Sequence, residues 1–225
     1  IINELMVTPM LFSDATSTPA KALKKEANRR RKLWDEDSPD KNKAGNRLVI
    51  IGYDGDKKYE NVPSYIPGDT IKKVNGKTMT LIEFFVHSPF KDSLVEGRAE
   101  SDKNVTSIVM QVRFKKSSSD TKPSALYLFG GDADHYIWEE IQNQSSAHNN
   151  GGKLDFDIFL APHHCSWTYF NDVPYKKGET DEPVESSKKL IKDHKVSGAV
   201  IIASSKQIND DDDNPPHYTE KKEYV

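Results

Sequence analysis

The 225-residue chain has a single cysteine, no long apolar run and almost no net charge. One cysteine, Cys165, excludes an internal disulfide framework and any zinc site built from several cysteines, and it suits a reducing, cytoplasmic location. No stretch approaches the roughly 18 consecutive apolar residues of a membrane-spanning helix, so we expect no membrane partner. A net charge of −3 provides no overall attraction to nucleic acid.

Hydrophobic residues are also scarce, at 35%, whereas 30% of residues are charged. This composition predicts a modest core with long polar loops, and 21 aromatic residues exclude full disorder. Since domains commonly hold about 100–200 residues, we expect residues 1–225 to belong to one domain with surface insertions near 35–46 and 60–77.

Apolar periodicity and turn residues predict mixed secondary structure. Thr18 and Pro19 are typical of a helix start. The expected helices cover residues 19–34, 134–142 and 185–195, and the expected strands cover 2–7, 47–52, 80–86, 106–114, 124–129, 156–161 and 199–203. The last strand is apolar throughout, which predicts burial on both faces. Hairpin-like strands followed by strand–helix–strand units favour an α+β or a layered α/β fold.

Polar residues that could carry chemistry follow two of these strands. Asp132 comes after a Gly-Gly step, and the pair His163-His164 comes after Pro162. Carboxylate and imidazole are ligands that zinc accepts, and they also suit manganese. Asp132 could instead be a turn or helix N-cap residue, and one histidine of the pair could be structural. Two histidines at one strand end favour a functional site.

These segments resemble one known family. The strand end His87-Ser88-Pro89, the segment 104–109, "LYLFGGDAD" (126–134) and "DIFLAPHHCS" (157–166) are similar to the second half of a metallo-β-lactamase-fold hydrolase of the ComEC-type, competence-related branch. The resemblance covers residues 82–218 and is most specific at Pro-His-His-x-Ser. It implies an α/β fold, the four-layer αββα sandwich, which is incomplete in this chain.

The resemblance also implies roles for individual residues. Asp132 would bridge two divalent ions, zinc or manganese, His164 would bind the second ion, and His163 would face a substrate phosphate. His217, in the reordered element Asn214–His217, is a further catalytic candidate. Asn104 and Ser107 are weaker candidates for substrate contact. The implied activity is metal-dependent hydrolysis of phosphoester bonds by a nuclease or phosphodiesterase.

The chain departs from the family pattern at two points. Cys165 stands where the family has Gly, and Cys tolerates positive φ poorly. The family's His-x-His/Asp-x-Asp-His cluster is missing, since residues 132–135 only mimic its end. We therefore expect an amino-terminal segment or a second chain to supply further metal ligands. The apolar opening residues 1–7 read as the middle of a buried strand, which favours the same expectation.

Other readings remain open at this point. The fold could be catalytically silent and serve as a binding or regulatory module. The basic segment Lys21–Lys32 could contact nucleic acid, although a solvated helix face is the commoner meaning of such a run. Cys165 could act as a nucleophile with a neighbouring histidine. The run Asp210–Asp213 does not alternate as calcium loops do, so a solvated loop is expected.

Overall fold

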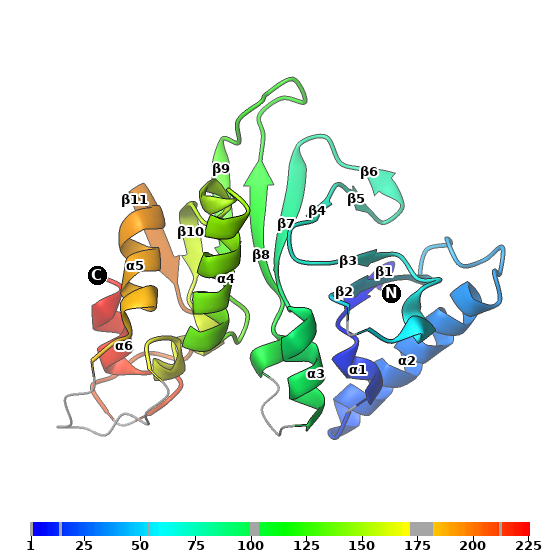
Figure 1. Cartoon of the computed structure of the whole chain (residues 1–225), viewed down its shortest axis with the longest axis horizontal. Helices are drawn as coiled ribbons and strands as arrows, with labels where there is room; N and C mark the ends of the chain where they lie inside the picture. The colour runs from blue at the N-terminus through cyan, green and yellow to red at the C-terminus, as the bar shows by residue number, and fades with distance from the viewer. Residues whose placement is uncertain (1, 14, 54, 100–103, 172–181, 212) are drawn as a thin grey trace.

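The structure is a computed structural model that describes residues 2–13, 15–53, 55–99, 104–171, 182–211 and 213–225 (Figure 1). The helices are α1 (Met10–Ser13), α2 (Thr18–Asp35), α3 (Lys91–Ala99), α4 (His135–Ala147), α5 (Glu185–His194) and α6 (Tyr218–Glu223). The strands are β1 (Glu4–Val7), β2 (Arg47–Ile51), β3 (Ser64–Tyr65), β4 (Thr70–Ile71), β5 (Lys73–Val74), β6 (Lys77–Thr78), β7 (Ile82–Ser88), β8 (Val109–Phe114), β9 (Ala125–Phe129), β10 (Phe156–Leu160) and β11 (Lys195–Ile202).

The larger sheet has six strands in the order β11-β10-β9-β8-β7-β4. Strands β4, β7, β8 and β9 pair antiparallel, whereas β9, β10 and β11 run parallel to one another. Helix α4 connects β9 to β10 and helix α5 precedes β11, so strand–helix–strand units follow the hairpins. The mixed α/β class expected from the sequence is confirmed.

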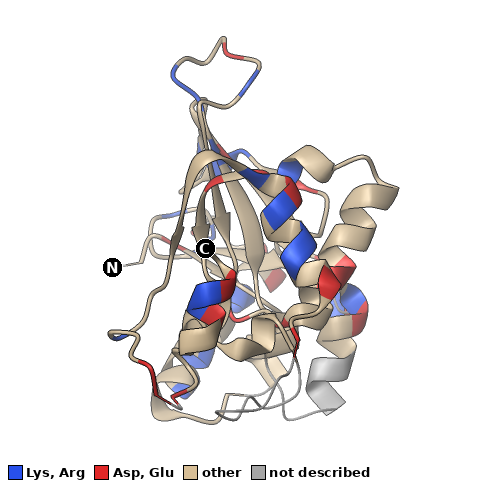
Figure 2. Cartoon of the chain, turned by 90° about the vertical axis from the view of Figure 1, so that its left-hand side faces the viewer, with Lys and Arg blue, Asp and Glu red and all other residues tan. Residues whose placement is uncertain are grey.

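Helices α4 and α5 cover one face of this sheet (Figures 1 and 2). The apolar stripe of α4, with Trp138 and Ile141, packs against Leu128 and Phe159 of the sheet, and Leu190 of α5 joins the same core. Acidic and basic residues are interspersed along the α5 ribbon (Figure 2), as expected for a solvated outer face.

A second sheet consists of the parallel strands β1, β2 and β3. Leu48 and Ile50 of β2 pack with Ala27 of α2 in one apolar cluster. The alternate residues Val49 and Ile51 pack with Ile71 and Val86 of the larger sheet. Strand β2 therefore places one face against α2 and the other against the six-stranded sheet.

Several details differ from the sequence expectations. Helix α2 is capped by Ser17 rather than Thr18, because the Ser17 hydroxyl accepts a hydrogen bond of 3.3 Å from the Ala20 N–H. Strand β7 ends two residues later than expected, at Ser88. Strand β11 is not buried on both faces, since it forms the sheet edge and leaves Val200 and Ile202 54% and 43% exposed.

Within the described ranges, no helix has both the length and the apolar character needed to cross a membrane.

Candidate metal centre

The candidate site lies where β9 and β10 end side by side. Phe129 pairs with Leu160 in parallel register, so the Gly130-Gly131-Asp132 turn and the Pro162–His164 turn leave the same edge of the sheet. A Cβ atom on Gly130 would lie 2.7 Å from Pro162 Cγ and 2.8 Å from the Leu160 carbonyl oxygen. Glycine at this position therefore permits the close approach of the two turns.

The Asp132 carboxylate is exposed to solvent at this edge of the sheet. The reading of Asp132 as a helix cap is wrong, because the Asp134 side chain caps α4 by accepting the Ile137 N–H at 3.1 Å. The backbone N–H of Asp132 donates to Ser107 Oγ at 3.2 Å. Ser107 thus positions the Asp132 main chain.

The histidine pair lies in a strained turn rather than in extended backbone. His163, His164 and Cys165 have consecutive φ angles of +47°, +60° and +67°. A left-handed conformation costs an ordinary residue roughly 1–2 kcal/mol, so the turn is held against about 3–6 kcal/mol of strain. Cys165 thereby adopts the left-handed conformation for which glycine is better suited. Such strain persists only where the surrounding structure enforces it.

Hydrogen bonds from two directions enforce this turn. The His163 N–H donates to the Gly131 carbonyl at 2.9 Å, which ties the turn to the Asp132 segment. Asn214 Oδ1 accepts from the Ser166 hydroxyl at 2.8 Å and from the Trp167 N–H at 3.1 Å. The backbone N–H of His217 donates to the Cys165 carbonyl at 2.7 Å. The Asn214–His217 segment thus acts as a clamp on the turn.

His164 is fixed in one orientation and one tautomer. Its Nδ1 lies 2.9 Å from the Ser204 carbonyl oxygen, and because a carbonyl only accepts, Nδ1 carries the proton. In the Nδ1–H tautomer Nε2 presents a lone pair, and this atom lies 3.8 Å from Asp132 Oδ1. The side chains of His164 and Asp132 are 52% and 51% exposed, so both are open to a ligand from solvent.

These two side chains fit a divalent ion but do not complete a site. Zinc bonds to histidine nitrogen and carboxylate oxygen are about 2.0–2.2 Å long, so one ion can reach both atoms across 3.8 Å. A metal-ligating histidine usually donates its second ring N–H to a carbonyl or carboxylate, as His164 does to Ser204. In the described part of the chain, no group of three or more His, Cys, Asp or Glu side chains is placed to hold an ion.

The other two histidine candidates occupy different surroundings. His163 is half-buried, and its Nδ1 lies 3.2 Å from the Thr168 hydroxyl. His217 is only 2% exposed, caps α6 by accepting the Glu220 N–H at Nδ1, and packs against Trp167. His163 therefore lies beside His164 in the turn. His217 belongs instead to the Asn214–His217 segment, which holds the turn in place.

Two alternatives lose support from the geometry. Cys165 is buried, and burial raises the pKa of its thiol to about 12, so a thiolate nucleophile is disfavoured. Residues 132–135 resemble Asp-x-Asp-His, but His135 is buried and Asp134 caps α4. These two residues therefore do not add metal ligands to the site.

The charged segments are largely engaged within the chain. Arg30 is buried and donates to the carbonyls of Ile2 and Arg47, and Arg29 donates to Glu26 and the Gly45 carbonyl. Further ion pairs join Arg31 to Asp35 and Lys32 to Glu36. The basic face of α2 available to nucleic acid is therefore smaller than its sequence indicates.

The acidic run behaves as a surface loop where it is described. Lys206 pairs with Asp213, and the Asp213 N–H donates to Asp211 Oδ1. Asp212 lies outside the described residues.

Three residues that hold the site were not anticipated from the sequence as supports: Ser204, Thr168 and Asn214. Ser204 follows the apolar strand β11, and this position after a strand is the one signal that could have indicated it. Its contact with His164 joins residues 40 positions apart, which no local pattern specifies.

Comparisons of the chain with protein families, with curated proteins and with solved structures find no match.

Proposed function

We propose that this chain contributes part of the metal centre of a hydrolase that cleaves phosphoester bonds, as a nuclease or phosphodiesterase. One observation carries the proposal. The Ser204 carbonyl accepts the Nδ1–H of His164 and thereby holds Nε2 3.8 Å from Asp132 Oδ1, at an exposed and strained turn. Backbone strain and a fixed imidazole tautomer beside a carboxylate are features of built sites rather than of ordinary loops.

The packing supports the four-layer αββα arrangement of the metallo-β-lactamase fold as the architecture. Separate apolar clusters join α4 and α5 to the six-stranded sheet, that sheet to the three-stranded sheet, and the three-stranded sheet to α2. This order of contacts is helix, sheet, sheet, helix. In such an architecture the strand ends of the larger sheet carry the site.

Each residue then has a defined task. Asp132 and His164 would hold divalent ions, zinc or manganese. Such ions would supply Lewis-acid polarisation of the phosphoryl oxygens and lower the pKa of a water molecule toward neutral pH. His163 lies in the same turn and donates a hydrogen bond to the phosphate, with Thr168 orienting its ring. His217 keeps the turn in its strained conformation through its backbone N–H.

The remaining ligands come, in this proposal, from an amino-terminal segment or a second chain that covers a bare part of the larger sheet. A cross-strand row on one face runs through Val86, Met110, Phe129, Leu160 and Ile202. Val86 is fully buried beneath the three-stranded sheet, whereas Phe129 and Ile202 at the other end are 38% and 43% exposed. An additional apolar sheet packed next to β1–β3 would continue the cover along this row.

Lysine substitutions test this bare face. Ile202→Lys should leave the free energy of unfolding of the isolated chain within about 0.5 kcal/mol and reduce its self-association in light scattering. Ile201→Lys is the matched control. Ile201 packs against the core beneath the helices, so its replacement by Lys should destabilise the chain. Equal destabilisation by both substitutions would show that the face is already covered.

The metal proposal is tested by paramagnetic broadening in NMR spectra of the chain titrated with Mn²⁺. Because broadening reports weak binding, two protein ligands suffice for detection. Signals of Asp132, His164 and Ser204 should broaden first, and Asp132→Ala and His164→Ala should each abolish the effect. His194→Gln is the control, since it removes an imidazole from another histidine–carboxylate pair, with Asp155.

The result also separates the alternatives. Broadening centred on residues 209–213 would show that the acidic loop, not this turn, attracts cations. No broadening at Asp132 would leave a catalytically silent binding module as the better description. Retention of the effect in both alanine variants would contradict the assigned ligands.

A further inference from the structure

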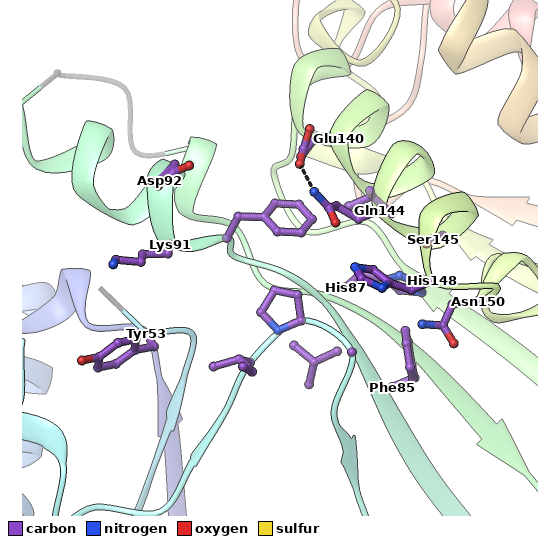
Figure 3. A pocket seen from close by; sticks show the side chains of 16 residues that line it. Tyr53, Phe85, His87, Lys91, Asp92, Glu140, Gln144, Ser145, His148 and Asn150 are labelled. Carbon is purple, nitrogen blue, oxygen red and sulfur yellow. Dashed lines mark hydrogen bonds between the residues drawn. The ribbon is translucent and has the colours of Figure 1, made fainter. Parts of the chain in front are cut away.

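A second candidate site lies beside α4, and the strand-end turns do not line it. A cavity of about 630 Å³ opens between α4, β7, the start of α3 and the loop that follows β3 (Figure 3). Sites for small organic ligands commonly enclose about 300–1,000 Å³. Asp132 and His164 do not line it, so it is separate from the proposed metal centre.

Aromatic and aliphatic side chains form much of the lining. Phe85 of β7 is 4% exposed, Phe90 lies just before α3, and Ile141 faces the cavity from α4. Pro67 also lines the cavity. Tyr53, which is 45% exposed, lies at one end of it (Figure 3). Flat side chains around an open space favour a planar ligand that buries its faces against them.

His87 provides a fixed hydrogen-bond acceptor in this lining. It is 3% exposed, and its Nε2 lies 2.8 Å from the Lys153 carbonyl oxygen, so Nε2 carries the proton and donates it. Nδ1 is then the ring atom available to a ligand, and no described residue forms a hydrogen bond with it. Burial lowers the pKa of His87 to about 4, which keeps the ring neutral and accepting near neutral pH.

The α4 wall adds two more acceptors. Gln144 Nε2 donates to Glu140 Oε1 at 2.7 Å, as the dashed line in Figure 3 shows. Because a carboxylate only accepts, the amide nitrogen must face Glu140, and the amide oxygen of Gln144 is free to accept. The second carboxylate oxygen of Glu140 is a further acceptor.

We propose that this cavity binds a planar nitrogen heterocycle with N–H donors, the chemical class of the amino-substituted nucleobases. A hydrocarbon of the same shape would leave the buried His87 acceptor without a partner, which is costly because water does not replace the lost hydrogen bond there. Glu140 and Asp92 place two carboxylates in the lining against the ammonium of Lys91, so the lining does not favour an anion. The site does not depend on the hydrolase function, since none of its residues belongs to the metal centre.

The test uses nucleosides, which carry no phosphate and therefore do not engage a metal centre. Chemical-shift changes in NMR spectra of the full 225-residue chain would be followed with adenosine, guanosine and cytidine. We expect at least one to bind, with changes at Phe85, His87 and Gln144. N6,N6-dimethyladenosine is the matched probe for adenosine, because its base keeps the ring but has no N–H donor.

Variants locate the binding. His87→Gln retains a donor for the Lys153 carbonyl but lacks the Nδ1 acceptor, and the exposed Gln144→Leu removes an acceptor without touching the core. Each should weaken binding about five-fold, as loss of one hydrogen bond implies. His194→Gln should leave the affinity unchanged.

The proposal is overturned if none of the three nucleosides binds at millimolar concentration, or if dimethyladenosine binds as well as a bound adenosine. Equal affinity of wild-type and Gln144→Leu chains would also overturn it. This last comparison stands even if His87→Gln fails to fold.

Discussion

His164 and His87 are each locked in one tautomer by a main-chain carbonyl, yet their surroundings give them opposite uses. His164 donates through Nδ1 to Ser204 and offers Nε2 at an exposed turn 3.8 Å from a carboxylate. His87 donates through Nε2 to Lys153 and offers Nδ1 inside a largely apolar cavity. The first setting favours a cation and the second a neutral donor. The same side chain thus becomes a metal ligand or an organic-ligand acceptor according to exposure and neighbouring charge.

The largest expected effect concerns the buried member of this pair. The pKa of His87 is about 4 in the folded chain against an ordinary 6.5, because burial disfavours the charged ring. The unfolded chain therefore binds more protons between pH 6.5 and 4, and folding stability falls as pH decreases through this window. His87 alone should remove about 3 kcal/mol between pH 7.5 and pH 4.

Urea unfolding at both pH values measures this loss. His87→Gln has no imidazole to protonate, so its decrease should be smaller than that of the wild type by about the same 3 kcal/mol. Buried Glu220, whose pKa burial raises, contributes to both chains and cancels in the difference. Parallel decreases in the two chains would mean that His87 is not held neutral by burial.

A smaller loss of stability is expected from a change at the strand-end turns that hold Asp132 and His164. Gly130→Ala places a Cβ atom 2.7 Å from Pro162 and 2.8 Å from the Leu160 carbonyl oxygen, so the turns that hold Asp132 and His164 must separate. Overpacking of this kind costs about 1–3 kcal/mol. Chemical-shift changes should concentrate at Asp132 and His164 and spare His87. Gly151→Ala is the control, because nothing lies within 4 Å of its added Cβ.

The smallest effect sharpens the role given to Ser204. Its carbonyl and its hydroxyl lie 2.9 Å and 3.1 Å from His164 Nδ1. Because a main-chain carbonyl survives substitution, Ser204→Ala should change stability by less than about 0.5 kcal/mol and leave Mn²⁺ broadening at Asp132 in place. Loss of the broadening would show that the hydroxyl, rather than the carbonyl, sets the tautomer.

Local patterns predicted much of the secondary structure but little of what surrounds the site. Apolar runs and the Gly-Gly step located β9, β10 and the turn at Asp132, because these features depend on neighbouring residues. The contacts of His164 with Ser204 and of Ser166 with Asn214 join distant parts of the chain, so no spacing reveals them. Burial of β11 was predicted wrongly because the same apolar residues suit a covered strand and an edge strand. The cavity at His87 depends on how α4 lies over β7, which is likewise a tertiary feature.

The proposed metal centre requires an Nδ1-protonated His164 whose free Nε2 shares a cation with Asp132. Its most direct test is the ¹⁵N NMR spectrum of the His164 ring at pH 7.5, recorded with and without Zn²⁺. We expect an unprotonated Nε2 in the free chain, a shift of that nitrogen on adding Zn²⁺, and no such shift in Asp132→Ala. A doubly protonated ring, paired with Asp132 and insensitive to Zn²⁺, would contradict it.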